Sequence, residues 1–112
     1  MVVGSGIVEL WIVDSNSLKD KRAVLRSILK RTQNTFNVSI AEVGDQDNWR
    51  RAVIGFSVVG NEQGFVNGKV DKILNFIEEL NLAEIVKSKV EIVTISNKMD
   101  RSGFEEEKYG AV

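Results

Sequence analysis

Residues 36–60, in the middle of the sequence, read FNVSIAEVGDQDNWRRAVIGFSVVG and carry the clearest strand signal. Residues 36–43 and 51–60 are both rich in β-branched and aromatic side chains, which favour strands. In the second run, every other residue is apolar and shares one face: Ala52, Ile54, Phe56 and Val58. Between the two runs, residues 44–48 read GDQDN, a composition that favours a turn. The pattern therefore predicts an antiparallel hairpin at the centre of the chain.

An amphipathic helix is predicted on each side of this hairpin. Upstream, apolar residues recur at helical spacing over residues 18–34, and Ser17 with Asp20 three positions later matches a helix-capping pattern. Downstream, the same spacing extends from residue 66 to residue 80. One more strand is predicted before the first helix, at residues 6–13, and another after the second helix, at residues 89–96.

This order of elements is that of the ferredoxin-like βαββαβ fold, an α+β arrangement. We expect a four-stranded antiparallel sheet with two helices on one face, so that sheet and helices enclose a single core. In the first strand, the alternation directs Val8, Leu10 and Ile12 to that core. We assign residues 1–96 to this one domain and residues 97–112, which include an acidic run at 105–107, to a flexible tail.

The composition excludes several classes of function. The 112 residues contain no Cys and no His, which rules out disulfides, thiolate nucleophiles, Ser-His-Asp triads and ordinary zinc sites. Carboxylates, lysines and Tyr109 are the proton-transfer groups that remain, so we expect a protein that is not an enzyme and holds no cofactor. Glu42, Asp45 and Asp47 are candidate Mg²⁺ ligands, but Asp is also an ordinary turn residue, and no metal is expected. With no signal-peptide pattern and no apolar run of about 18 residues, the protein is expected to be cytoplasmic and without membrane contact.

Basic charge is concentrated on the first predicted helix, although the whole chain has a net charge of -1. Residues 18–34 contain six Lys or Arg residues and one acid, Asp20. The predicted topology brings the start of this helix to the same end of the molecule as the hairpin turn. We therefore predict an anion-binding or nucleic-acid-binding surface made of Lys19, Lys21, Arg22, Arg26, Lys30 and Arg50.

Two explanations for these cations remain open. Cations in the first turn of a helix oppose the helix dipole, so their presence needs a compensating interaction. One compensation is surface ion pairing with Asp14, Asp20, Asp45 and Asp47. The other is a phosphate of RNA or of a small ligand, held together with the amides of the helix start. Stacking of RNA bases on the sheet is not expected, because Val53 and Gly55 occupy the positions where RNA-recognition motifs carry aromatic rings.

The face of the sheet that the helices leave open is predicted to be apolar. Its members are Ile7, Trp11, Val13, Val53 and Val59, and Glu9 is the one charged residue of the first strand. We predict that these five residues form a homodimer interface with Trp11 near its middle, because large aromatic rings are frequent interface anchors. The alternative is that the tail covers Trp11 through Phe104 or Tyr109.

Two segments carry a family resemblance. Residues 17–22 (SLKDKR), together with residues 36–44 (FNVSIAEVG), Asp47, Trp49 and residues 52–55 (AVIG), resemble the YlxP-like bacterial proteins, a family of unknown function. The resemblance extends from residue 1 to about residue 96 and implies a ferredoxin-like fold. Members of that family are often encoded among translation and ribosome-maturation genes, which implies a connection with RNA. The resemblance implies no catalytic residues and does not include the acidic tail.

Three functions follow from these observations. The first is a small RNA- or ribosome-associated binding protein that uses the basic first helix and the hairpin turn. The second is a homodimeric protein-interaction module without nucleic acid, and it is compatible with the first. The third and least supported is an enzyme.

Overall fold

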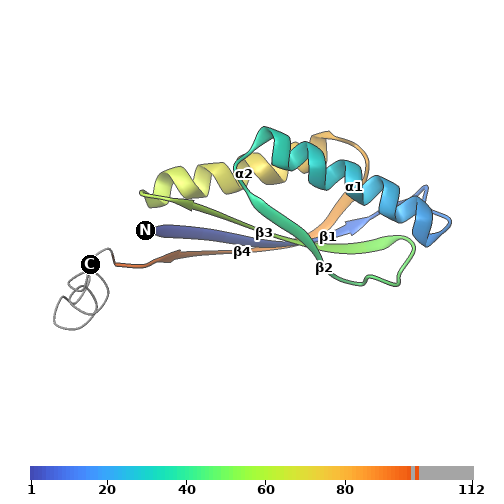
Figure 1. Cartoon of the computed structure of the whole chain (residues 1–112), viewed down its shortest axis with the longest axis horizontal. Helices are drawn as coiled ribbons and strands as arrows, with labels where there is room; N and C mark the ends of the chain where they lie inside the picture. Colours follow the sequence, from blue (N-terminus) through green and yellow to red (C-terminus); the bar gives the residue numbers. More distant parts are fainter. Residues whose placement is uncertain (97, 99–112) are drawn as a thin grey trace, which may run out of the picture.

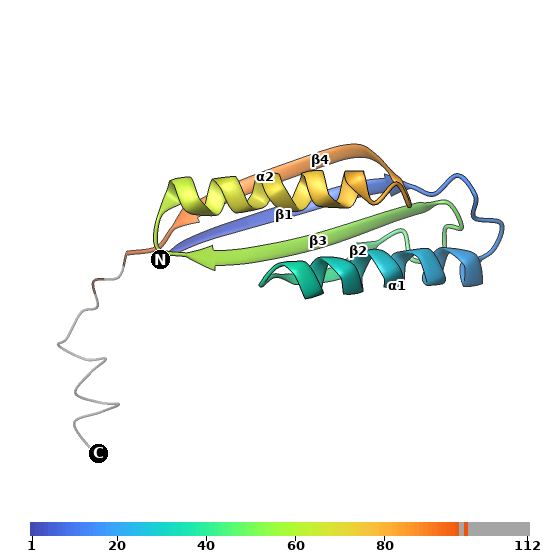
Figure 2. The same cartoon turned by 90° about the horizontal axis from the view of Figure 1, so that it is seen from above.

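The structure is a computed structural model and describes residues 1–96 and 98. The elements follow one another as β1 (Val2–Trp11), α1 (Leu18–Thr35), β2 (Ser39–Gly44), β3 (Arg51–Gly60), α2 (Gln63–Glu79) and β4 (Glu84–Thr94). The strands form one antiparallel sheet in the order β2-β3-β1-β4, and both helices lie on the same face of it (Figures 1 and 2). The predicted ferredoxin-like fold is confirmed. The predicted tail, apart from Lys98, lies outside the described residues.

The core lies between the sheet and the two helices, as the alternation of the two central strands predicted. β1 and β3 pair antiparallel with Val8 opposite Ile54 and Leu10 opposite Ala52, so these side chains point together to the helices. The buried apolar residues of these strands and of the segment just after β1 include Val8, Leu10, Ile12, Ala52, Ile54, Phe56 and Val58. The helices complete the core with Leu25, Ile28, Val66, Val70, Ile73 and Ile77. Burial of this shared apolar face stabilises the two layers against each other.

Several strand boundaries differ from the prediction. β2 begins at Ser39 and not at residue 36, and β1 ends at Trp11 and not at residue 13. β1 begins at Val2 and not at residue 6. Gly4 and Gly6 are therefore inside the strand, and both are buried on its helix side. A Cβ on Gly4 would lie 2.7 Å from Cγ1 of Val66, and one on Gly6 would lie 2.6 Å from the ring of Phe56. The two glycines therefore allow Val66 and Phe56 to pack closely on β1. Because glycine is uncommon inside strands, the sequence alone did not indicate that the strand includes them.

β4 begins at Glu84, five positions before the predicted start at residue 89, and pairs with β1 along its length. Its register shifts between the partners of Glu9 and Leu10, so that Val86 is an extra residue at a bulge. Most of its side chains are exposed on both faces, as is common for a strand at the edge of a sheet. The missing apolar alternation at residues 84–88 explains why the sequence did not predict this half of the strand.

The described helices carry no candidate membrane span, since neither is long and apolar enough to cross a bilayer. The ring of Phe36, the residue that follows α1, packs against the ring of Phe76 in α2, with centroids 5.4 Å apart at an interplanar angle of 85°. Edge-to-face packing of this kind is favourable for aromatic pairs.

Candidate nucleic-acid interface

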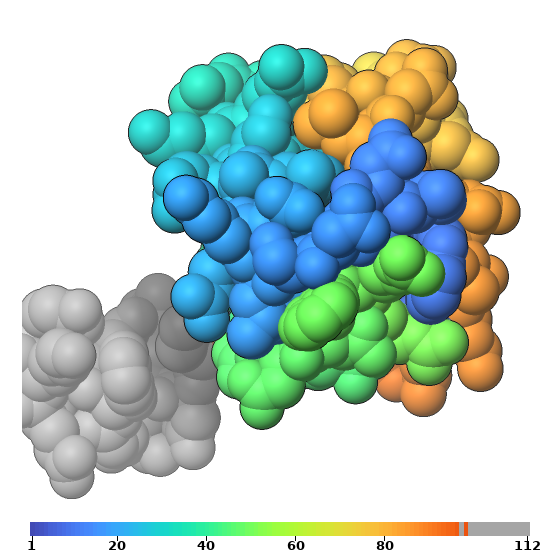
Figure 3. Space-filling model, turned by 90° about the vertical axis from the view of Figure 1, so that its right-hand side faces the viewer, coloured from blue at the N-terminus to red at the C-terminus, as the bar shows by residue number. Residues whose placement is uncertain are grey.

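The start of α1 and the β2–β3 loop share one end of the molecule, as predicted (Figure 1). Figure 3 views this end and shows the segment that leads into α1, in blue, lying against the loop, in green. α1 begins where Ser17 caps it: the Asp20 backbone N–H donates to Ser17 Oγ at 3.1 Å. The Asp20 carboxylate in turn accepts from the Asn16 backbone N–H at 3.1 Å. The predicted cap is confirmed, and it fixes the direction in which the basic side chains leave the helix.

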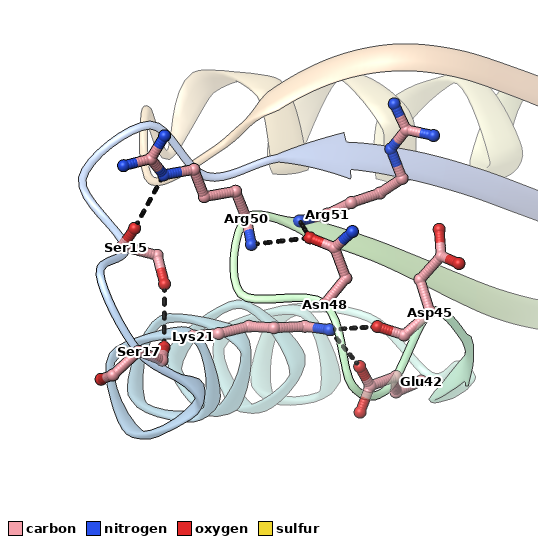
Figure 4. Close-up of polar contacts among 8 residues, drawn as sticks. All are labelled: Ser15, Ser17, Lys21, Glu42, Asp45, Asn48, Arg50 and Arg51. Carbon is pink, nitrogen blue, oxygen red and sulfur yellow. Dashed lines mark hydrogen bonds and ion pairs between the residues drawn. The ribbon is translucent and has the colours of Figure 1, made fainter.

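Lys21 requires a correction, because it points into the protein and not to solvent. Its side chain is 1% exposed, and its Nζ lies 3.2 Å from Oε2 of Glu42 on β2. The same Nζ donates to the backbone oxygen of Asp45 at 2.5 Å (Figure 4). The sequence prediction considered only aspartates as ion-pair partners and missed Glu42. Lys21 joins α1 to the β2–β3 loop, and we remove it from the predicted anion-binding set.

The β2–β3 loop is built by local hydrogen bonds that also involve Arg50 (Figure 4). The side-chain oxygen of Asn48 accepts from the backbone N–H groups of Arg50 and Arg51 at 3.0 and 2.9 Å. Arg50 Nε donates to the backbone oxygen of Ser15 at 3.0 Å, which ties this loop to the segment before α1. The rest of the Arg50 side chain is exposed, so its predicted role in anion binding stays a prediction.

The other four predicted cations form one exposed row, which we call the basic stripe: Lys19, Arg22, Arg26 and Lys30. Their spacing of three, four and four residues places them on one side of α1, over about 16 Å at a rise of 1.5 Å per residue. Within residues 1–96 and 98, the ion pairs are Lys21 with Glu42 and Arg51 with Glu9, so no described carboxylate neutralises the stripe. None of the four aspartates that the sequence offered as partners, all of them among the described residues, forms an ion pair with the stripe.

Comparison with known proteins identifies the family. The family model described as "Protein of unknown function (DUF503)" matches residues 3–98. This chain belongs to the DUF503 family. It is 43% identical over 77 residues to a protein named "Uncharacterized protein YlxP" from Bacillus subtilis (strain 168), a match that covers 69% of this chain and 84% of that protein. The resemblance to YlxP-like proteins is confirmed.

Solved structures similar to this DUF503 protein have low sequence identity. The designed protein Foldit4 has a TM-score of 0.48 at 17% identity and covers 86% of this chain and 100% of its own. A designed protein, LFR1 1, described as having a ferredoxin fold, has a TM-score of 0.44 at 13% identity, with 90% and 93% covered. A dimeric ferredoxin-like protein from an uncultured marine organism has a TM-score of 0.44 at 10% identity, with 85% and 97% covered.

The open sheet face of this DUF503 protein is less uniform than predicted. Ile7 and Val59 are 52% and 58% exposed and point away from the helices, and Val53 is half-buried beside them. Val13 is exposed but lies beyond the end of β1. Val43, at an irregularity of β2, is a further exposed apolar residue that the prediction missed.

The position predicted for Trp11 is wrong. Trp11 is the last residue of β1 and pairs with Arg51 and Glu84, the first residues of β3 and β4, so it lies at one end of the sheet. It is half-buried and lines a surface hollow of about 420 Å³ together with Leu82 and Ala83, which follow α2. Trp11 is therefore not in the middle of an open apolar face. Phe104 and Tyr109, the alternative covers predicted for it, lie outside the described residues.

Proposed function

We propose that this protein binds RNA through the phosphate backbone, using the basic stripe of α1, and that it catalyses no reaction. The observation that carries the proposal is the row of four exposed cations without a carboxylate partner among the described residues. Lys19 is in the first turn of the helix, where a cation opposes the helix dipole. A bound phosphate would remove that unfavourable interaction and would also accept hydrogen bonds from the stripe.

The chemistry of the stripe favours backbone contacts over recognition of bases. Lys and Arg side chains in a straight row on a helix match a line of phosphate charges, which carries no sequence information. The sheet offers no row of aromatic rings for stacking, because the residues of β3 that face away from the helices include Val53 and Gly55. We therefore expect RNA binding with little sequence preference and a strong dependence on salt.

The salt dependence of RNA affinity tests this proposal. The test variant replaces Lys19, Arg22, Arg26 and Lys30 by Gln, and binding of a single-stranded RNA is measured from low to high salt. Each lost phosphate contact should lower the slope of log affinity against log salt by about 0.7. The matched control removes four charges elsewhere on the surface, through Gln at Arg31, Lys69, Lys72 and Lys87.

The control separates local contacts from net charge. We expect the control to keep most of the wild-type slope and the stripe variant to lose most of it. Equal losses in the two variants, or a wild type that does not bind RNA at low salt, would contradict the proposal. Single-stranded DNA of the same sequence serves as a comparison, because a contact to the ribose 2′-OH would make RNA the tighter ligand.

The second candidate function is self-association through the open sheet face, favoured by the exposure of Ile7 and Val59. A second copy stacked on this face would remove these apolar side chains from water. Sedimentation equilibrium of Ile7→Lys tests it, because a buried unpaired ammonium should weaken such a dimer strongly. A wild type that is monomeric at high micromolar concentration would contradict this candidate.

A further inference from the structure

The outer edge of β4 is a long row of backbone groups without a strand beside it. β4 has eleven residues and is the last strand of the sheet order, paired only with β1 within the described residues. β2, the other edge, has six residues and an irregular register. An exposed edge strand is a template for pairing with another strand, and proteins commonly block such edges. β4 is therefore the edge at which another chain can extend the sheet.

We propose that a second copy of this chain pairs with β4 edge to edge and antiparallel, with the two-fold axis at Val90, and forms a continuous eight-stranded sheet. In such a pair the same strand meets itself, so the interface must be complementary to itself. Two observations select the two-fold position: the charges along β4 and the place of its bulge.

The charges of β4 favour an axis at Val90. Lys87, Lys89 and Glu91 project from the open face of the sheet, since Lys89 is opposite the exposed Ile7 in β1. With the axis at Val90, each Lys89 is directly opposite Glu91 of the second copy, which makes two attractive cross-strand pairs. Neither side chain has an ion pair with a described residue that this contact would have to break.

Neighbouring positions of the axis bring like charges together. An axis at Ser88 places Lys87 opposite Lys89 twice. An axis at Lys89 or at Glu91 places that residue opposite itself, and like charges directly opposite each other are destabilising. Lysine on an edge strand ordinarily opposes pairing, but with the axis at Val90 each Lys89 gains a carboxylate partner.

The bulge supports the same position independently. β4 pairs regularly with β1 over residues 87–94, beyond the register shift. Val90 is the central residue of the seven residues 87–93. Pairing about Val90 therefore uses seven regular residues of each copy and stops before the bulge at Val86. A bulge twists and kinks its strand, so a longer overlap would be poorly matched.

The contact also covers apolar surface on both sides of the sheet. Val90 points to the helix side, opposite Gly6 in β1, and is 38% exposed. In the pair it contacts its own copy, while Ile92 meets Ser88. On the open face Val93, 49% exposed, packs against the aliphatic part of Lys87. The basic stripe stays accessible in this pair, because α1 lies at the other edge of the sheet, beside β2 (Figure 2).

Charge exchange tests the pairing of Lys89 with Glu91. Lys89→Glu places carboxylates opposite each other and Glu91→Lys places ammonium groups opposite each other, so each variant should dimerise at least tenfold more weakly than wild type in sedimentation equilibrium. A mixture of the two variants should form a heterodimer, since every pair is then attractive, and the double variant should regain the wild-type constant. Lys87→Glu is the matched control and should change the constant little, because its opposite residue is Val93.

Disulfide capture tests the axis itself. The chain has no Cys, so a single introduced cysteine can form only an intermolecular bond. Facing residues of an antiparallel pair have Cα atoms about 4.5–5.5 Å apart, within the range of a disulfide. Val90→Cys should therefore give a covalent dimer under mild oxidation. Val93→Cys is the exposed control, because its two copies would be about 20 Å apart at roughly 3.3 Å per residue.

Each outcome decides the proposal. Capture at position 90 with little at position 93, and rescue in the charge mixture, support edge pairing about Val90. A wild type that is monomeric at high micromolar concentration overturns it. So does a dimer that Ile7→Lys dissociates while Val90→Cys is not captured, because that dimer would use the open face. RNA binding by the basic stripe is measured separately and does not depend on these results.

Discussion

The two helices cover the same face of the sheet but are attached to it in different ways. The four buried residues of α2 are all aliphatic: Val66, Val70, Ile73 and Ile77. The four buried residues of α1 are Lys21, Leu25, Ile28 and Thr32, so half of them are polar. α1 also has a side-chain cap at Ser17, whereas Glu62, the residue before α2, makes no side-chain cap bond.

α1 therefore presents a charged surface to solvent while contacts of two kinds hold it in place. α2 is attached by burial of apolar area, which needs no particular partner geometry. α1 buries less apolar surface and is positioned in addition by directional contacts, the Ser17 cap and the bonds of Lys21 to Glu42 and Asp45. We infer that these contacts fix the orientation of the basic stripe. Four substitutions, one in α2 and three in α1 or at its cap, test this difference between α1 and α2 through the free energy of unfolding.

The largest effect is expected in α2, from Ile73→Ala. Ile73 is fully buried between α2 and the sheet, so truncation leaves a cavity and should cost about 2–5 kcal/mol of unfolding free energy. Urea denaturation measures this loss. A cost below that of truncating Leu25 in α1 would contradict the view that α2 depends more on apolar burial.

The next effect is expected from Lys21→Met, which removes the cation from the buried pair. Glu42 would then keep a partly buried carboxylate without a partner, and because its side chain is 23% exposed the cost should be about 2–3 kcal/mol, below the range for a fully buried pair. The double variant Lys21→Met/Glu42→Leu should recover much of this loss, because no charge is left buried. If the double variant is as unstable as the single one, the contact of Lys21 with Asp45 is the more important part.

Removal of the α1 cap should have a smaller effect. Ser17→Ala leaves the Asp20 backbone N–H without its acceptor and should cost about 1 kcal/mol. Glu62→Ala is the matched change at the start of α2 and should cost much less, since no side-chain cap bond exists there. Thermal unfolding of the two variants compares them, and equal losses would show that the caps do not distinguish the helices.

The smallest effect is expected from Lys19→Gln, and its sign is opposite. Removing a cation from the first turn relieves its repulsion from the helix dipole, so stability should rise by about 0.3–1 kcal/mol at low salt. Arg26→Gln, in the middle of α1, should leave stability unchanged. A loss of stability in Lys19→Gln would mean that Lys19 has a structural contact, and its assignment to the basic stripe would then be wrong.

Much of this fold was predictable, and the exceptions have identifiable causes. The order of elements, the core face of β1 and β3, and the Ser17 cap were all predicted from local patterns. The first residues of β1 were missed because Gly4 and Gly6 are poor strand formers in isolation and are tolerated only beneath Val66 and Phe56. The first half of β4 was missed because it is exposed on both faces and shows no apolar alternation.

The candidate site was predicted in part for a similar reason. Helical spacing was sufficient to place Lys19, Arg22, Arg26 and Lys30 in one row. The same spacing put Lys21 near the apolar flank of α1, but its partner Glu42 is 21 positions away on another element. The clue was available in β2, where Glu42 follows Ile40 on the core face of the strand and so needs a buried cation.

Local patterns were enough to predict the elements, their order and the two faces of each. These features follow from backbone periods of 2 and about 3.6 residues, which operate over short distances. Three further features could not be predicted in this way: the ion-pair partners, the position of Trp11, and the strand that is left as an open edge. Those features depend on contacts between residues far apart in the chain, and such contacts exist only after the sheet and helices have packed. Lys21 is an example, because it is buried among contacts with β2 and the β2–β3 loop, whereas Lys19 and Arg22 face solvent.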